Sequence, residues 1–159
     1  MPTHPLPAPP PTGAFDVRLV GDDPARAVVE SYIARRYSRC HGARIAAFMP
    51  HLLAATAGDR VAAALGLRPA QTIPLFLETY LDTPIETAVA AHLCQPVERT
   101  QVVEIGNLAA SNRRAGQLLV ALLIAGLRGA GFRWLVFTAT RQVRERVAAL
   151  GLPLHALAA

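Results

Sequence analysis

The pattern of apolar and polar residues predicts an opening strand and helix. Residues 14–20 alternate between apolar and polar types, as in a half-buried strand. Asp22 or Asp23 followed by Pro24 is typical of a helix start, and apolar residues then recur at helical spacing. We expect this helix to run to about residue 37, with Gly42 at the exit.

A hairpin and a second helix are predicted next. The apolar runs 48–55 and 61–67 flank a Gly-Asp pair, which favours two antiparallel strands joined by a tight turn. The pattern over 72–80 fits no single element. Thr83 to Glu86 has the form of a capping box with proline at the first helical position, so a helix to about residue 92 is expected.

Strands and helices alternate clearly in the second half of the chain. The predicted order is strand 101–109, helix 117–127, strand 132–138, helix 141–150 and a last strand through Leu154. The expected fold class is therefore α/β (α+β), with a mixed, mostly antiparallel sheet flanked by helices.

Length and composition favour one folded domain after a flexible tail. The 159 residues suffice for one ordinary core, and 52% are hydrophobic while 17% are charged. Residues 1–13 are rich in proline and lack the pattern of a secretory signal, so they are interpreted as a flexible tail. The domain is expected over residues 14–159.

The charge pattern favours an anionic partner. The net charge is +5, and all 16 basic residues are arginines, whose planar forks suit phosphates, although a codon bias could also produce this composition. Nucleic acid is disfavoured because the arginines are scattered and are not interleaved with aromatics. An acidic acyl carrier protein or a nucleotide cofactor fits better.

Membrane and metal roles find little support in the sequence. The most apolar run, 118–127, is well short of the roughly 20 residues needed to span a bilayer. Cys40 and Cys94 match no metal or redox spacing, and His51 and His155 are isolated, so no metal site is expected. Reduced thiols favour a cytoplasmic location.

The segment from Glu104 to Gln117 carries the chemistry expected of this chain. A strand leads into a small, polar turn at a helix start, where free N–H groups and the helix dipole favour an anion. Ser111 or Asn112 capping an ordinary helix is the alternative, with the arginines merely solvated. The residues expected to bind a phosphate-bearing cofactor are Leu108, Ala109, Ser111, Asn112, Arg113, Arg114, Ala115, Gly116 and Gln117.

This segment resembles the cofactor loop of the Gcn5-related N-acetyltransferase fold, which has the form Arg/Gln-x-x-Gly-x-Gly/Ala. Arg113 and Gly116 fit, whereas Leu118 departs at the last position. The sequence is also identified as a member of the bacterial thermostable hemolysin family. The segments that carry this resemblance are RIAAFMPHLLA, GLRPA, PLFLETYLDTPIETA, VVEIGNLA and FRWLVFTATRQVRERVAALGLPLH.

Members of that family resemble acyl-homoserine-lactone synthases, which share the acyltransferase fold. The resemblance implies acyl transfer from acyl-CoA or from the phosphopantetheine of an acyl carrier protein to a small amine. Those synthases carry a Glu-x-x-Arg motif, of which Glu104 matches and Asn107 departs, so their acceptor is not implied. Val147 stands where many acetyltransferases have a tyrosine acid.

We predict Glu104 as the general base, because a carboxylate on a core strand beside a cleft favours proton uptake. An acceptor for an arginine or a backbone N–H inside the fold is an equally weighted role. Backbone N–H groups near Leu108 and Ala109 would hold the thioester carbonyl. Arg35, Tyr37 and Asn107 are predicted to bind the acceptor. A membrane-active haemolytic protein and a non-catalytic acyl- or pantetheine-binding module are the alternative functions.

Overall fold

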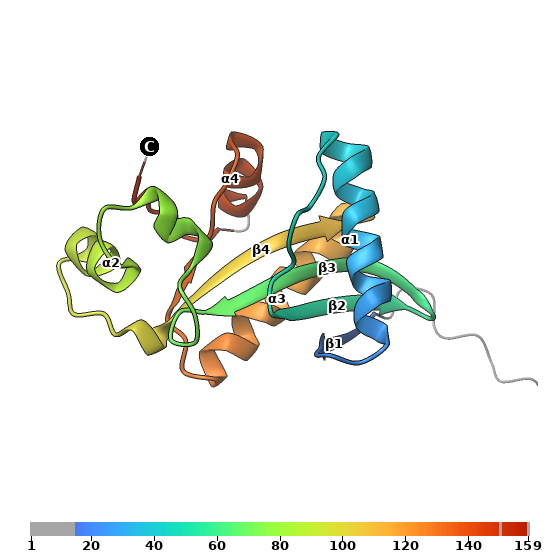
Figure 1. The fold of residues 1–159 in the computed structure, drawn as a ribbon, viewed down its shortest axis with the longest axis horizontal. Coiled ribbons are helices and arrows are strands. Elements are labelled where there is room, and N and C mark those ends of the chain that lie inside the picture. The colour runs from blue at the N-terminus through green and yellow to red at the C-terminus, as the bar shows by residue number, and fades with distance from the viewer. Residues whose placement is uncertain (1–14, 150, 159) are drawn as a thin grey trace, which may run out of the picture.

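One five-stranded sheet organises the part of the chain that the computed structural model describes, residues 15–149 and 151–158 (Figure 1). The strands follow one another in the sheet in chain order. They are β1 (Asp16–Val20), β2 (His51–Ala57), β3 (Arg60–Pro69), β4 (Val102–Ala110) and β5 (Trp134–Val136). The helices are α1 (Ala25–His41), α2 (Ile85–Leu93), α3 (Arg113–Gly129) and α4 (Arg141–Ala148), with short 3₁₀ helices η1 (Phe76–Tyr80) and η2 (Arg99–Gln101).

Strands β1 to β4 form an antiparallel meander. The β2–β3 hairpin turns at Gly58, whose φ of 59° lies in the left-handed region that a glycine adopts without strain. Strand β4 then pairs antiparallel with β3 and parallel with β5. The sheet is therefore mixed and mostly antiparallel, which confirms the predicted fold class.

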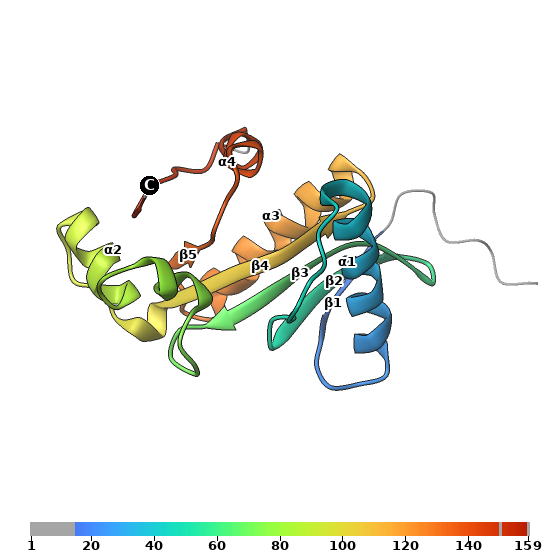
Figure 2. The ribbon, with the colours of Figure 1, turned by 45° about the horizontal axis from the view of Figure 1, so that its top comes forward.

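Helix α3 covers one face of the sheet (Figure 2). Ala115, Leu119 and Leu123 of this helix are buried against side chains of β2, β3 and β4, including Leu65 and Val103. Residues two apart along a regular strand share a face, so Leu65 and Leu67 of β3 and Val103 and Ile105 of β4 point toward α3. Burial of this apolar stripe is what fixes α3 on the sheet.

Two separate apolar clusters occupy the opposite face. Helix α1 packs through Val29, Tyr32 and Ile33 at one end of the sheet. Helix α2 packs through Ile85 and Val89 at the other end, and the two helices lie apart over this face in Figure 1. Between the two clusters the floor of the sheet consists of Gly66 and Arg68 from β3 and Glu104 and Gly106 from β4.

Strands β4 and β5 stay together over only a short distance. Their parallel register joins Val102, Val103 and Glu104 to Trp134, Leu135 and Val136. Beyond Glu104, β4 continues to Ala110, whereas the segment after β5 leaves the sheet and runs to α4. One edge of β4 is thus without a strand partner after Glu104 within the described residues.

Several predicted boundaries need correction. Residues 151–158 contain no strand, so the last strand expected through Leu154 is wrong. Helix α3 begins at Arg113 rather than at Gln117, and most of the expected turn is its first turn. The capping box at Thr83 is also wrong, because the N–H of Ile85 donates to Glu78 from the preceding 3₁₀ helix. The predicted tail, residues 1–13, lies outside the described residues.

Candidate active site

A bulge interrupts β4 midway along its length. Gly106 pairs with Gly66 and Ala109 pairs with Ala64, so two residues of β4, Asn107 and Leu108, oppose the single residue Leu65. Asn107 has a φ of 52°, in the left-handed region that asparagine tolerates better than most residues. The position compared above with an arginine of the synthase motif is therefore the bulge residue.

The bulge turns a backbone N–H toward the free edge of β4. The N–H of Ser111 donates to the Ala62 carbonyl at 2.8 Å, so the N–H of Ala109, two residues earlier, also faces β3. By the same alternation the N–H of Leu108 faces away from β3, toward the side that β5 has left. Of the two groups predicted to hold a thioester carbonyl, this geometry favours Leu108 and disfavours Ala109.

The side chain of Asn107 fastens the bulge to the segment before β2. Its Oδ1 accepts a hydrogen bond from the N–H of Met49 at 2.9 Å. Met49 is buried and lies across Gly66 and Gly106, where an added Cβ would come within 2.5 Å and 2.6 Å of its side chain. These two glycines are thus required by the close approach of Met49, and Asn107 acts as a structural acceptor.

Glu104 occupies the adjoining part of the floor and is only 2% exposed. Its Oε2 accepts from the N–H of Phe76 at 2.9 Å, and its Oε1 accepts from the N–H of Leu77 at 3.0 Å. The structure therefore places Glu104 in the alternative role named above, an acceptor for backbone N–H groups inside the fold. Its role as a general base stays a prediction.

Arg68 lies beside Glu104 on the neighbouring strand. The two residues are directly opposite in the β3–β4 register, and Nη1 of Arg68 is 3.6 Å from Oε2 of Glu104. This separation marks an ion pair but exceeds a good hydrogen bond. Within the described part of the chain, the buried Nε of Arg68 has no hydrogen-bond partner.

The 3₁₀ helix η1 places two aromatic rings at this end of the floor. Phe76 and Tyr80 are 55% and 61% exposed and contact each other edge to face, with centroids 5.8 Å apart. The backbone of Phe76 is the one that Glu104 holds. Sequence reasoning missed both rings because the pattern over 72–80 fitted no regular element. The contact with Glu104 connects the backbone of this segment with β4.

An ion-pair network centred on Arg99 holds η1 in place. Nη1 and Nη2 of Arg99 donate to the carboxylate of Glu78 at 2.6 and 2.8 Å, and Nη1 also donates to Glu86 at 2.7 Å. Hydrogen bonding to Arg99 is the main cause that lowers the pKa of Glu78 to about 2, and the same pairing raises the pKa of Arg99. The network ties η1 to the start of α2.

Ser111 is engaged at the end of β4. Tyr32 of α1 donates its hydroxyl to the Ala62 carbonyl at 2.8 Å, and the Ser111 hydroxyl lies 2.8 Å from the Tyr32 oxygen. Because the single proton of Tyr32 is used on Ala62, Ser111 is the donor to Tyr32. This hydroxyl joins α1 to the strand, and its predicted contact with a cofactor stays a prediction.

Asn112 caps α3. Its Oδ1 accepts from the N–H of Ala115 at 2.9 Å, which uses one of the four free N–H groups of the first turn. Gly116 has already entered the regular ladder by donating to the Asn112 carbonyl at 3.3 Å. An anion at this helix start would meet the N–H groups of Arg113 and Arg114 and their two exposed side chains.

The small residue at position 116 has a packing explanation. A Cβ at Gly116 would lie 3.1 Å from the Cβ of Ala110, so the glycine lets α3 sit close on β4. Ala115 is buried against the sheet and Gln117 is half-buried. This packing is one explanation of the glycine, and the predicted contact of Gly116 with a cofactor stays a prediction.

The two residues predicted on α1 lie on its C-terminal half. Arg35 is exposed, and Tyr37 is half-buried beside the α1 cluster and in edge contact with His41. Burial raises the pKa of Tyr37. In the described residues no hydrogen bond joins either side chain to Glu104 or Asn107, so their role in binding an acceptor stays a prediction.

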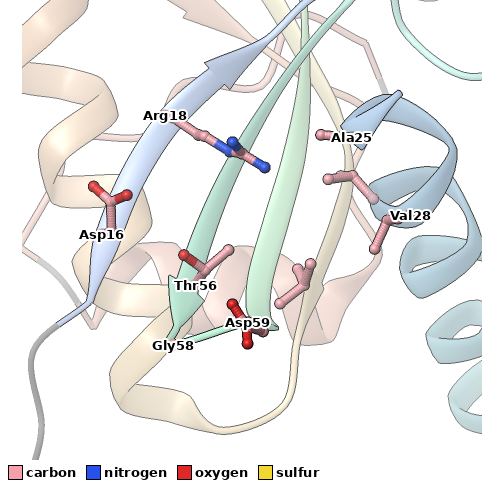
Figure 3. Close-up of a pocket in the computed structure, with 9 residues that line it drawn as sticks. Asp16, Arg18, Ala25, Val28, Thr56, Gly58 and Asp59 are labelled. Carbon is pink, nitrogen blue, oxygen red and sulfur yellow. The ribbon is translucent and has the colours of Figure 1, made fainter. Parts of the chain in front are cut away.

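A pocket with a volume of 310 Å³ lies elsewhere, between the β2–β3 turn, β1 and the start of α1 (Figure 3). Asp16, Arg18 and Asp59 reach its rim, and Val28 lines its wall. It contains none of the residues predicted for the site. The free edge of β4 and the floor between α1 and α2 therefore remain the candidate active site.

Neither a metal centre nor a membrane span is visible in the described ranges. Residues 15–149 and 151–158 hold no cluster of three or more histidine, cysteine or acidic side chains arranged for a metal ion. None of the helices described is both long and apolar enough to cross a bilayer.

Comparison with known proteins relates this arrangement to acyltransferase folds. The family described as thermostable hemolysin matches residues 20–159. The crystal structure of TofI, in a complex with an inhibitor and MTA, superposes with a TM-score of 0.63 at 17% identity, covering 91% of this chain and 82% of TofI. No curated protein matches the sequence.

Two further solved structures support the same fold. The AHL synthase LasI has a TM-score of 0.64 at 11% identity and covers the same shares, 91% of this chain and 82% of LasI. A GCN5-related N-acetyltransferase from Ralstonia eutropha JMP134 has a TM-score of 0.53 at 16% identity, covering 89% of this chain and 94% of that enzyme. Identities this low establish the fold, and the chemistry has to be argued from the residues.

Proposed function

The chain belongs to the thermostable hemolysin family, and from this membership and its fold we propose that it is an acyltransferase. The donor is an acyl thioester of CoA or of an acyl carrier protein, and the acceptor is a small amine. The observation that carries the proposal is the bulge of β4 at Asn107, which lies beside the edge that β5 leaves open.

The reaction requires few groups from the protein. The amine nitrogen attacks the thioester carbonyl, a C–N bond forms, and the carbonyl oxygen becomes an oxyanion. The N–H of Leu108 faces the side where this oxygen would lie, and a preorganised donor of this kind contributes several kcal/mol. The C–S bond then breaks and the sulfur leaves as a thiolate, which is a tolerable leaving group because thiols have a pKa near 8.5.

The donor is held, in this proposal, by the start of α3. Its two open N–H groups and the exposed guanidinium groups of Arg113 and Arg114 suit the phosphates of CoA or phosphopantetheine. An acidic carrier protein would also be attracted by the net charge of +5. Such donors are cytoplasmic metabolites, so we infer a cytoplasmic site of action.

Glu104 has a clearer role as a positioning residue than as a base. Both of its oxygens accept backbone hydrogen bonds, from the N–H groups of Phe76 and Leu77. Through these bonds it holds the segment that carries Phe76. Removal of the amine proton falls in this scheme to water that reaches the site.

The experiment that tests the proposal is a donor and acceptor panel. Pure protein is incubated with acyl-CoA and acyl-carrier donors of several chain lengths and with a mixture of small amines. We expect thiol release with at least one donor, together with an amide product identified by mass spectrometry. Absence of thiol release and of any donor-induced thermal shift across the whole panel would refute the proposal.

A further inference from the structure

Arg68 has fewer hydrogen-bond partners than Glu104, the other charged group on the floor of the candidate site. Its side chain is 19% exposed, and its Nε is buried with no hydrogen-bond partner among the described residues. A buried donor without a partner is costly to the fold, because it has lost its hydrogen bonds to water and gained none in return. Because the unpartnered Nε of Arg68 brings little benefit to the fold, a bound ligand is the better explanation for it.

Glu104 does not satisfy this guanidinium. Each of its oxygens already accepts a backbone N–H at 2.9 or 3.0 Å, whereas the nearest Arg68 nitrogen stays 3.6 Å away. The pair therefore leaves most of the Arg68 donor fork available. A planar fork of this kind is best matched by a carboxylate, which accepts two parallel hydrogen bonds.

The position of Arg68 assigns this carboxylate to the acceptor rather than to the donor. Arg68 is two residues from Gly66 on β3, and Gly66 opposes Gly106 next to the bulge. The donor arginines follow the far end of β4, beyond Ala110. From Glu104 to Leu108 is four residues, or about 13 Å along an extended strand, so an anion at Arg68 and the donor phosphates would lie on opposite sides of the reacting carbonyl.

The exposed aromatic rings add a second preference. Glu104 holds the backbone of Phe76, so the Phe76–Tyr80 pair is fixed close to the Arg68–Glu104 pair. Exposed aromatic rings in edge contact offer an apolar surface to a bound side chain. The backbone contact with Glu104 thus ties the segment that carries these exposed rings to the end of the sheet that holds Arg68.

We propose that the acceptor is an amino acid with an apolar side chain, whose carboxylate binds Arg68 and whose side chain packs on Phe76 and Tyr80. This inference rests on the proposed acyl transfer. The α-amine forms the new C–N bond to the acyl carbon as the C–S bond breaks, the amine loses one proton to water, and the thiol is released. The carboxylate is unchanged, and the product is an N-acyl amino acid.

The test compares acceptors that differ only in the carboxylate. The full chain, with the acyl donor that gives the fastest thiol release, is assayed with phenylalanine, phenylalaninamide and 2-phenylethylamine. We expect kcat/KM for phenylalanine to exceed that of the other two amines at least tenfold. Equal values for the three amines would overturn the inference while leaving acyl transfer established. Failure of every donor and amine would remove the proposed function, and this inference with it.

Two variants locate the effect. Arg68→Gln should raise KM for phenylalanine at least tenfold and KM for 2-phenylethylamine much less. Arg60→Gln is the matched control, because Arg60 is an exposed arginine at the other end of the same strand. Equal losses with both amines in folded Arg68→Gln would contradict a carboxylate contact. If circular dichroism shows that this variant is unfolded, the acceptor comparison in the wild-type protein decides alone.

Discussion

Asn107 and Met49 are joined by a hydrogen bond of 2.9 Å from the N–H of Met49 to Oδ1 of Asn107. The contact fastens the bulge of β4 to the segment that leads into β2, 58 residues earlier in the chain. The local distortion that opens one N–H toward the free edge is thus stabilised by a tertiary contact. Residue 107 has to supply an acceptor and to tolerate a positive φ.

Asn107→Ala should be destabilising for both reasons. The Met49 N–H loses its partner and alanine is strained at a φ of 52°, so we expect the free energy of unfolding to fall by about 2–3 kcal/mol. Urea denaturation measures this loss. Asn107→Asp keeps the oxygen and should stay within about 1 kcal/mol of wild type, whereas Asn107→Gly should lie between the two. Equal losses for the alanine and aspartate variants would contradict the assigned hydrogen bond.

The two glycines under Met49 should respond differently to substitution. A methyl group at Gly66 would meet Cβ of Met49 at 2.5 Å, and this atom cannot move without its backbone. At Gly106 the contact is with the terminal Cε at 2.6 Å, which can rotate away. We expect Gly66→Ala to cost about 1–3 kcal/mol in thermal or urea unfolding and Gly106→Ala clearly less.

Adding Met49→Ala to each of these variants separates steric conflict from other effects. It should relieve most of the penalty of Gly106→Ala, because the atom that clashes is removed. It should leave the penalty of Gly66→Ala largely in place, because the Cβ remains. If Met49→Ala relieved the penalty of Gly66→Ala more than that of Gly106→Ala, Met49 would not lie across the strands as described.

Glu104→Gln should act mainly on stability. A glutamine offers one oxygen to two backbone donors, so its amide group would face the N–H of Phe76 or Leu77. We expect a loss of about 1–3 kcal/mol in unfolding free energy. A variant that keeps wild-type stability but has no acyl transfer would instead support the general-base role predicted from the sequence.

Acid should weaken the ion-pair network of Arg99, Glu78 and Glu86 that holds η1. The pKa of Glu78 is lowered from 4.5 to about 2, so its ionised form stabilises the native state above pH 4.5, and this contribution is lost as the pH falls toward 2. The contribution is about 3 kcal/mol. We expect Glu78→Gln to be less stable at pH 7 and to show a flatter stability profile between pH 4.5 and 2. The control is Glu145→Gln, because Glu145 lies in an exposed pair with Arg141.

Neutralising the arginines at the start of α3 should weaken donor binding. We expect the double variant Arg113→Gln with Arg114→Gln to raise KM for an acyl-CoA donor about tenfold, with a smaller dependence on salt than wild type. Arg128→Gln at the other end of the same helix serves as the control and should change neither KM for the donor nor its dependence on salt. An unchanged KM in the double variant would remove this helix start from the donor site.

The elements were largely readable from the sequence, because they depend on local patterns. Alternation of residue types located the antiparallel strands, and Gly58 marked the hairpin turn. The missing last strand shows the limit. An apolar stretch around Leu152 fits a strand or a coil equally, and only a pairing partner decides between them.

The site was less predictable, because its geometry depends on contacts between distant segments. Glu104 was singled out correctly as a buried carboxylate, yet its partners at Phe76 and Leu77 are 28 and 27 residues away. The bulge at Asn107 depends on Met49, and nothing in the sequence around Asn107 indicates that contact. The unpartnered Nε of Arg68 is likewise visible only once β3 and β4 are in register.

The limited pairing of β5 also bears on how the molecule opens. Strands β2 and β3 are joined by a tight turn and share seven residue pairs, whereas β5 lies at the edge of the sheet and is held by three residue pairs. We therefore expect amide hydrogens of β5 to exchange faster than those of β3. The edge at which we place the reaction would then be able to open and admit a long acyl chain while the meander stays folded.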